Sequence, residues 1–377
     1  MKVSELEASN VCRQCQCELA ADDAFCESCG AATGRLPAEP PEITGTAPTS
    51  SLPDAIAADV DATQTQPNPI VRICAACQGL IAADGYCGSC GAKGRTERDH
   101  WNEHPVPWAA AVCDRGIRHH RNEDAVALVA SEAAGSFAAL VVCDGVSTSS
   151  NSDVASLAAV HAAVAVLSGV ASETASSFAT RLVSISAAIE RAGADAQMVV
   201  AAVTATEMSE HPSPPSCTFV AAVLSESLIV AGWVGDSRAY WLPDAGGAEM
   251  LSVDHSVASE MIRAGATREA AETSPDAHAI TRWLGVDAPN AVPQIATTMV
   301  RCAGWLLVCS DGLWNYCSDP FAVDALLREL ATSIGGAEAD SVDPCALGEA
   351  LVAWANTQGG HDNISVVLAR VPAPKPE

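Results

Sequence analysis

The sequence predicts an α+β fold in which two β-sheets pack together and helices cover them on the outside. Strand-like apolar runs occur in groups, and pairs of long apolar helical segments interrupt these groups, which suggests α+β layers. The 377 residues are 49% apolar and only 4% aromatic, so a sizeable core is expected from small aliphatic side chains. This length suits one large domain with appendages.

The main body is predicted over residues 108–372, and its first half alternates strands with helices. "PWAAAVCDRG", "EDAVALVASEA" and "GSFAALVVCDG" have the short apolar runs of buried strands. Residues 153–170 and 175–203 are expected to form two long apolar helices, with Asp153 as the cap of the first.

The second half of the body continues this pattern. "SCTFVAAVLS" and "SLIVAGWVGDSRAYWL" are predicted to pair as a hairpin, because the polar "SES" between them suits a turn. Helices are expected near 254–265, 320–334 and 345–356, and late strands at "WLLVCSDG" and "NISVVLARV".

Charge and targeting signals indicate a cytoplasmic protein. The net charge of −26 argues against nucleic acid or an anionic membrane as a partner, since both need a basic face. The N-terminus "MKVSELEASNVC" lacks the basic and apolar regions of a signal peptide. Residues 154–172 are long and apolar enough to raise a membrane span, but their serines and His161 favour a buried alanine-rich helix.

Cysteines are concentrated at the N-terminus, where nine of sixteen fall before residue 91. "CRQCQCELAADDAFCESCGA" and "CAACQGLIAADGYCGSCGA" are two copies of one pattern with paired Cys-x-x-Cys knuckles. Four thiolates at this spacing suit one tetrahedral zinc ion per copy, in a closed and therefore structural site. The predicted Zn²⁺ ligands are Cys12, Cys15, Cys26 and Cys29 in the first site, and Cys74, Cys77, Cys87 and Cys90 in the second.

Disulfides in a secreted module are the alternative to zinc, and the missing signal peptide makes them the weaker interpretation. The repeat resembles the double zinc ribbons that bacteria attach to signalling proteins. The predicted organisation is a first ribbon over 1–32, a flexible Pro/Ala/Thr-rich linker over 33–70, a second ribbon over 71–93 and a second linker over 94–107. Thr63 or Thr65 could be phosphorylated to recruit a phosphothreonine-binding protein, although a plain linker is the simpler interpretation.

Carboxylates recur at the ends of the predicted strands. Asp144, Asp236, Asp311 and Asp362 lie there beside glycine, serine or asparagine, and Glu123-Asp124 stands in "RNEDA". One acidic turn after a strand is ordinary turn chemistry, but four after apolar strands suggest convergence on hard cations. Oxygen ligands alone select Mg²⁺ or Mn²⁺.

The order of "DRGIRHHRNEDA", "VVCDGVS", "SCTF", "VGDSRAYWL", "DHS", "ITRWLG", "LLVCSDGLW" and "GGHDNISVV" resembles the metal-dependent protein phosphatases, the type-2C serine/threonine phosphatases. The resemblance covers nearly all of residues 108–371. It implies an α-β-β-α sandwich and hydrolysis of phosphoserine and phosphothreonine in proteins by a metal-bridged hydroxide.

The resemblance also implies a role for each matching position. Asp144 would bridge two Mn²⁺ or Mg²⁺ ions, the Gly145 carbonyl would bind the first, and Asp311 and Asp362 would hold the second. Glu123 and Asp124 would act through metal-bound waters. Asp236 matches the position that helps to bind a third, weaker metal.

Two positions depart from the family pattern. Ser147 and Thr148 replace a glycine pair, which leaves the metal ligands intact but changes the turn that follows them. The phosphate-binding arginine is replaced by His119, so that either the neighbouring Arg118 takes the role or a histidine binds phosphate less firmly.

The leading hypothesis is a serine/threonine phosphatase acting on phosphorylated proteins, opposed by a serine/threonine kinase and regulated or recruited through its ribbons. A weakly active, phosphatase-like binding protein is the alternative that the two departures motivate. A third possibility is an adaptor in which the ribbons dominate and hydrolysis is secondary.

Overall fold

The computed structural model describes residues 73–374, apart from 75–76, 83–84, 92–93, 173–176, 207–212, 268–269, 272, 278 and 336–341. The predicted first ribbon with Cys12, Cys15, Cys26 and Cys29, the linker over 33–70 and Thr63 and Thr65 therefore lie outside the described residues.

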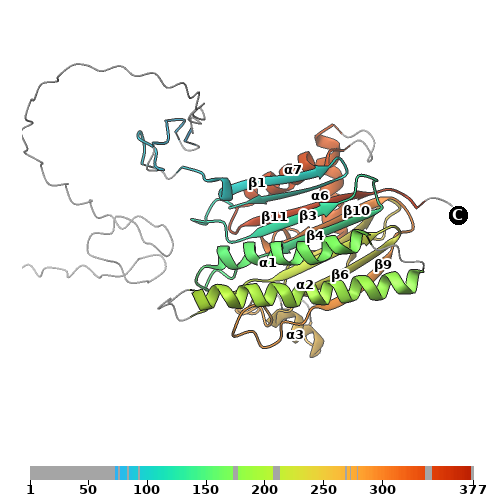
Figure 1. Cartoon of the computed structure of the whole chain (residues 1–377). Helices are drawn as coiled ribbons and strands as arrows, with labels where there is room; N and C mark the ends of the chain where they lie inside the picture. The colour runs from blue at the N-terminus through green and yellow to red at the C-terminus, as the bar shows by residue number, and fades with distance from the viewer. Residues whose placement is uncertain are drawn as a thin grey trace, which may run out of the picture. The chain divides into compact units, whose positions relative to one another are not determined.

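Two antiparallel sheets form the centre of the fold (Figure 1). The six-stranded sheet has the order β1-β2-β11-β10-β7-β8, and the five-stranded sheet has the order β3-β4-β5-β6-β9. The strand bounds are β1 His100–Val106, β2 Ala109–Asp114, β3 Ala125–Ala130, β4 Phe137–Cys143, β5 Phe219–Ser225, β6 Leu228–Val234, β7 Arg238–Pro243, β8 Glu249–Met250, β9 Gln294–Met299, β10 Gly304–Cys309 and β11 Ile364–Val371.

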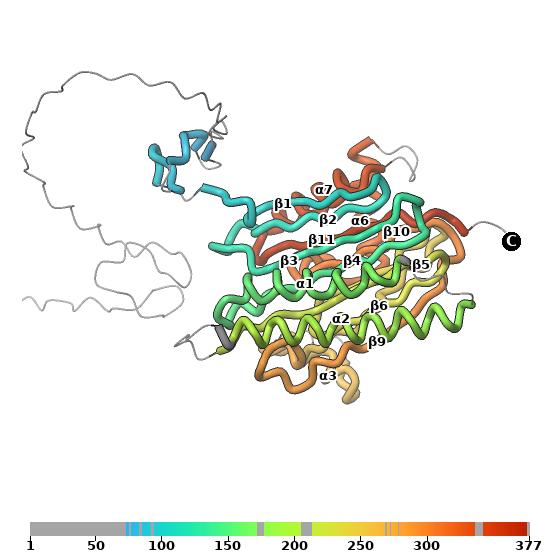
Figure 2. The backbone as a smooth tube through the Cα atoms, in the orientation of Figure 1, coloured from blue at the N-terminus to red at the C-terminus, as the bar shows by residue number. Residues whose placement is uncertain are grey.

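Helices cover the outer faces of both sheets, which confirms the predicted sandwich. Helices α1 (Ser152–Ser168) and α2 (Phe178–Thr206) lie side by side along the five-stranded sheet (Figure 2), and α6 (Pro320–Ser333) and α7 (Pro344–Thr357) cover the six-stranded sheet. The shorter helical segments are η1 (Glu97–Asp99), η2 (Gly169–Ser172), α3 (Val257–Arg263) and α5 (Asp311–Trp314).

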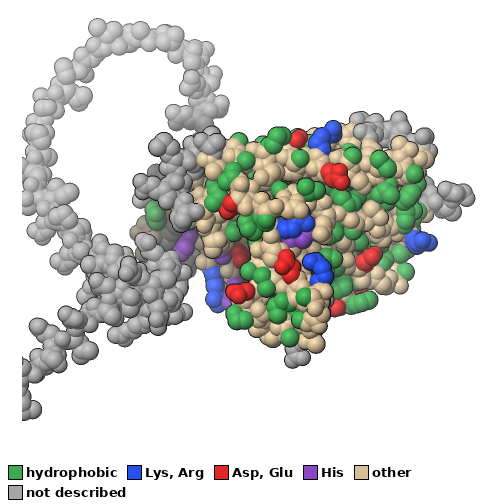
Figure 3. All heavy atoms as spheres, turned by 90° about the horizontal axis from the view of Figure 1, so that it is seen from below, with side chains coloured by type: hydrophobic (Ala, Val, Ile, Leu, Met, Phe, Trp, Pro, Cys, Tyr) green, Lys and Arg blue, Asp and Glu red, His purple; other side chains and the backbone are tan. Residues whose placement is uncertain are grey.

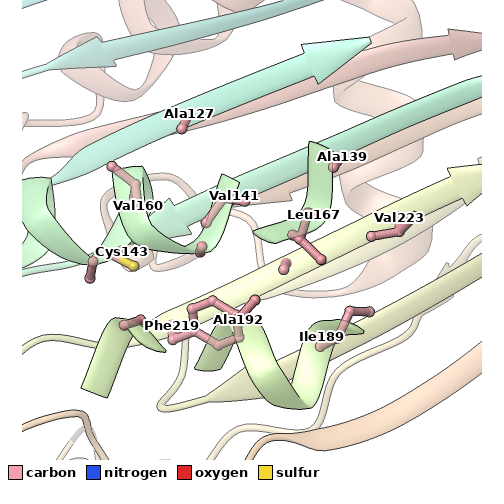
Figure 4. Packing of buried hydrophobic residues seen from close by; sticks show 14 of the residues in the cluster. Ala127, Ala139, Val141, Cys143, Val160, Leu167, Ile189, Ala192, Phe219 and Val223 are labelled. Atoms are coloured by element: carbon pink, nitrogen blue, oxygen red, sulfur yellow. The ribbon is translucent and has the colours of Figure 1, made fainter. Parts of the chain in front are cut away.

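Both faces of the central strands are buried, which explains their continuous apolar sequences. Along β4, Val141 and Cys143 face α1 and α2, whereas Leu140 and Val142 face the opposite sheet. Figure 4 shows the helix side of this arrangement, where Val160 of α1 lies over the strands. Small side chains on both helices let them pack closely on the sheet, including Ala155, Ala159, Ala163, Ala188, Ala192 and Ala196.

The apolar segment that was considered as a possible membrane span forms a helix that packs on the core. The helical stretch Ser152–Ala171 is long and apolar enough to cross a membrane by length and composition alone. Its small and aliphatic side chains pack instead on α2 and on strands β3 and β4. One face of this alanine-rich helix is therefore packed in the core, and 39% of its apolar window is buried.

Three expectations about local structure were wrong. The linker predicted over 94–107 contains η1 and strand β1, which pairs antiparallel with β2. Strands β5 and β6 pair as the predicted hairpin, but the run 228–243 is two strands in different sheets, because the chain crosses between the sheets at Gly235, where φ is 111°. Helix α1 begins after Asn151, whose φ is 46°, so Asp153 lies in the first turn and is not the cap. Strand β9 was not predicted.

The acidic excess does not gather into one patch on the face drawn in Figure 3. Acidic and basic side chains are interspersed there among apolar ones. The acidic groups that bear on function lie at the ends of the two sheets, in a cavity described below.

Candidate metal centre

The two sheets bring carboxyl groups together at the ends of their strands. Asp144 follows β4 of the five-stranded sheet, and Asp311 follows β10 of the six-stranded sheet. Asp236 lies in the crossing between β6 and β7. Asp362 was expected after a strand, but it precedes β11; because β11 runs antiparallel to β10, its start lies at the end of β10, beside Asp311.

A cavity of about 480 Å³ collects these groups. All five positions predicted to bind Mn²⁺ or Mg²⁺ line it: Asp144, Gly145, Asp236, Asp311 and Asp362. The serines and threonine after Gly145 line it as well, so the Ser147-Thr148 departure lies in the wall of the site.

The carboxyl groups repel one another in the cavity, where Asp236 is buried and Asp144, Asp311 and Asp362 are half-buried. Burial raises the pKa of Asp144 well above its ordinary value, and the neighbouring Asp124 and Asp311 raise it further. Burial followed by the charge of Asp362 does the same for Asp311, and burial and Asp254 raise the pKa of Asp236 to about 7. A cluster of buried acids in this state favours the binding of cations, which would return them to their charged form.

Backbone hydrogen bonds fix the position of Asp144. Its amide donates to Thr218 Oγ1 at 3.0 Å, and its carbonyl accepts from the Thr218 amide at 2.7 Å. Thr218 Oγ1 lies 2.8 Å from Ser237 Oγ. Sequence reasoning did not single out Thr218 or Ser237, although both belong to motifs that carried the resemblance, "SCTF" and "VGDSRAYWL".

Gly145 needs the absence of a side chain. A Cβ at this position would lie 2.6 Å from the Glu123 carbonyl oxygen and 2.9 Å from Ser152 Cβ. The glycine therefore lets the 144–145 turn pack against the loop that carries Glu123 and Asp124.

Side chains from distant segments hold the loop 122–124. Asn363 Oδ1 accepts from the Glu123 amide at 2.7 Å, and Asn122 Oδ1 accepts from the Asp124 amide at 3.2 Å. Ser365 Oγ donates to Asp124 Oδ2 at 2.8 Å. Burial raises the pKa of Asp124 to about 6.

Glu123 does not line the cavity, so it can support the candidate metal centre only through the residues that it contacts. Ser152 Oγ and Arg121 Nη2 donate to its Oε1 at 2.5 and 2.7 Å. Burial alone would raise the pKa of Glu123, but hydrogen bonds from His119, Ser152 and Arg121 lower it to about 2. Glu123 is therefore a charged anchor for these side chains.

The two candidates for the phosphate-binding position have different surroundings. His119 Nε2 lies 3.2 Å from Asp362 Oδ1, and its Nδ1 lies 3.7 Å from Glu123 Oε2. The neighbouring Glu123 carboxylate raises the pKa of His119. Arg118 is exposed, and its backbone amide donates to the Gly360 carbonyl at 3.1 Å. Neither side chain lines the cavity.

The cavity also has apolar lining residues that sequence reasoning did not assign to the site. These are Pro214, Ile280 and Trp283. Trp283 Nε1 donates to Asp287 Oδ1 at 2.9 Å, and Asp287 lines the cavity as well.

The second cysteine repeat forms a separate thiol cluster. Cys74 Sγ lies 3.7 Å from Cys90 Sγ, and Cys77 Sγ lies 3.4 Å from Cys87 Sγ. Tetrahedral zinc with bonds of about 2.3 Å places its sulfur ligands about 3.8 Å apart, so the cluster fits that ion. The Ser89 amide donates to Cys87 and is the largest influence that lowers its pKa, to about 6, which favours the thiolate that zinc requires.

The two clusters differ in how tightly their ligands converge. Within the described part of the chain, only the four cysteines bring all their ligand atoms within 4.8 Å of one another. The wider spacing of the carboxylates suits Mg²⁺ or Mn²⁺, which retain several water ligands.

Comparison with known proteins identifies a matching family and similar phosphatases. The family described as "Protein phosphatase 2C" matches residues 116–353. "Serine/threonine phosphatase stp" of Listeria welshimeri is 29% identical over 256 residues, which cover 68% of this chain and 92% of that protein.

Two solved structures share the fold. The serine/threonine phosphatase PstP/Ppp of Mycobacterium tuberculosis matches with a TM-score of 0.55 and 23% identity, over 70% of this chain and 98% of that one. The catalytic domain of a PstP phosphatase in complex with two manganese ions matches with a TM-score of 0.50 and 24% identity, over 70% of this chain and 97% of that one.

Proposed function

The chain belongs to the protein phosphatase 2C family and is a serine/threonine phosphatase, and from this premise we propose that the carboxylate cavity holds the divalent cations for the hydrolysis of phosphorylated proteins. The observation that carries the proposal is the convergence of half-buried carboxyl groups from both sheets on one cavity, each raising the pKa of its neighbours. Such a cluster is costly to bury without a counter-charge.

We assign the ligands by their place in the cavity. Asp144, the Gly145 carbonyl, Asp311 and Asp362 would hold two ions, and Asp236 would contribute to a third. Manganese is the preferred choice over magnesium, because a solved relative carries two manganese ions. Bound divalent cations supply a nucleophilic water at neutral pH and neutralise charge on the phosphoryl group.

The protein's own residues position this chemistry. The rigid ends of β4 and β10 fix Asp144 and Asp311, which keeps both carboxylates on one side of the cavity. Asp124 sits behind them with its Oδ2 held by Ser365, and Glu123 orients His119 and Arg121. His119 is the candidate of the two that can approach a bound phosphate, since it already contacts Asp362.

The apolar residues that line the cavity suit the peptide chain around the phosphorylated residue. The indole of Trp283 and the side chains of Pro214 and Ile280 would contact carbon atoms of the substrate, while the acidic side accepts the phosphate with its cations.

Phosphate release from a phosphothreonine peptide tests the assignment. Turnover is expected with Mn²⁺, is abolished by EDTA, and is lost in Asp311→Asn with Mn²⁺ present. Asp195→Asn, the same exchange on α2 outside the cavity, should hydrolyse the peptide at the wild-type rate. Absence of turnover in a folded wild-type protein would instead favour the phosphatase-like binding protein.

The N-terminal module and the cellular setting complete the proposal. The thiols of Cys74, Cys77, Cys87 and Cys90 would hold one structural Zn²⁺, whose loss unfolds the module and leaves the phosphatase domain intact. A cytoplasmic location, an opposing serine/threonine kinase and an interaction role of the ribbons belong to the same proposal.

A further inference from the structure

The segment that joins the thiol cluster to the phosphatase domain makes direct contact with the metal-site loop. Arg98 lies in η1, ahead of residue 116, where the family match begins. Its Nη2 donates to the carbonyl of Asp124 at 3.0 Å, and to the carbonyls of Asn122 and Asp153 at 3.4 Å each. One guanidinium thus bridges the loop 122–124 and the first turn of α1.

The Glu123 carbonyl, the third one of this loop, is also held by a residue outside the loop. The Glu123 carbonyl accepts from Ser156 Oγ and lies against Gly145, where a Cβ would approach it to 2.6 Å. Arg98 therefore fixes the carbonyls of Asn122 and Asp124. These lie on either side of the Glu123 carbonyl, which packs against the proposed cation-binding turn at Gly145. A shift of the loop would be passed directly to Gly145 and to the Asp124 carboxyl.

The surroundings of Arg98 keep it in place. Its guanidinium carbon lies 4.6 Å from the centre of the Trp101 ring, a cation–π distance. Asp99 is buried, its carbonyl accepts from the Arg115 amide at 2.8 Å, and its carboxylate closes a capping box with Thr96. The segment is thus bonded to the body through Asp99, the residue that follows Arg98.

Packing alone does not account for an arginine here. Nη1 of Arg98 is buried and has no hydrogen-bond partner among the described residues. Leaving a buried donor unpaired is unfavourable, and an apolar side chain would fill the same space without that penalty. The contacts that the guanidinium does make are with the metal-site loop.

We propose that Arg98 is a positioning residue for the metal centre, supplied by the segment that precedes the phosphatase domain. The inference rests on the proposed metal site. Residues behind metal ligands typically change metal affinity about 10- to 100-fold when they are replaced. Arg98→Gln is therefore expected to weaken Mn²⁺ binding by about that factor.

The test compares Arg98→Gln with Arg95→Gln in the full-length protein. Arg95 is exposed and makes one long contact of 4.0 Å with Asp114, so its loss should leave Mn²⁺ binding within twofold of wild type. Free Mn²⁺ is counted by electron paramagnetic resonance, and peptide hydrolysis is measured against Mn²⁺ concentration. In Arg98→Gln, the peptide KM at saturating Mn²⁺ should be unchanged, and Arg98→Lys should bind Mn²⁺ with intermediate affinity.

The outcomes separate the alternatives. A folded Arg98→Gln protein that binds Mn²⁺ as wild type does, with only a lower melting temperature, would overturn the positioning role. If that variant does not fold, Arg98→Lys and Trp101→Leu replace it, and wild-type Mn²⁺ affinity in both would overturn the role as well. Wild-type protein that binds Mn²⁺ without hydrolysing the peptide would contradict the proposed function, while the binding measurement would still decide the role of Arg98.

Discussion

A methyl group added at Gly145 tests how tightly the metal centre is packed. In Gly145→Ala the new Cβ would lie 2.6 Å from the Glu123 carbonyl oxygen and 2.9 Å from both Ser152 Cβ and the Ser152 carbonyl oxygen. Since comfortable contacts are about 3.5 Å, backbone must move by roughly 0.6–0.9 Å. Overpacking of this kind costs about 1–3 kcal/mol of unfolding free energy.

Gly169→Ala provides a matched control. Gly169 caps α1 with φ −63°, and a Cβ there would contact nothing within 4 Å. Both changes reduce the freedom of the unfolded chain by a similar amount, about 0.4–1 kcal/mol, so their difference isolates the steric cost.

Differential scanning calorimetry in EDTA measures this difference without any contribution from bound cations. Gly145→Ala should melt about 2–12 °C below Gly169→Ala, from about 2–4 °C per kcal/mol in a domain of this size. Mn²⁺-dependent hydrolysis should fall in Gly145→Ala alone. Equal melting temperatures for the two variants would refute the packing argument.

Three further predictions concern the cations and one titrating group. Mn²⁺ at about 100 times its Kd should stabilise the wild type by about 2.7 kcal/mol, which raises the melting temperature by about 5–11 °C. This increase should be absent in Asp311→Asn. An equal increase in the variant would remove Asp311 from the ligand set. Zinc content measured by mass spectrometry should fall by about one ion per chain in Cys87→Ser, and unchanged content would exclude the thiol site. The hydrogen bond to Asp114 raises the pKa of His100 above 6.5, so its stabilising contribution is full below pH 6.5 and is lost as the pH rises through the folded pKa. His100→Gln should therefore lower the melting temperature more at pH 6 than at pH 8.5, and a pH-independent effect would contradict this linkage.

The sandwich and the carboxylates that line the cavity were accessible from the sequence because they depend on short-range patterns. Apolar runs that end in an acidic turn identified β4 with Asp144 and β10 with Asp311, and the structure brings both to one cavity. Strand β1 was missed because "HWNEHPV" is mostly polar and lies at the edge of its sheet, where one neighbour suffices. The crossing at Gly235 was missed because the apolar pattern continues on both sides of it.

The supporting residues could not be found from local patterns. Thr218 and Asn363 act through backbone groups that are far away in the sequence, and neither residue type signals such a role by itself. The position of His119 between Asp362 and Glu123 likewise depends on how three segments meet. Long-range contacts of this kind are fixed by the packing of the two sheets.

The distribution of the carboxylates over both sheets has a consequence for folding. Asp144 belongs to the end of one layer, Asp311 and Asp362 belong to the other, and Asp236 lies on the strand crossing that joins them. Neither layer alone presents the complete set of proposed ligands. If these carboxylates hold the cations, affinity arises only when the interface between the layers has closed. Cation uptake during refolding should then report the assembly of the sandwich and should lag behind the formation of its helices.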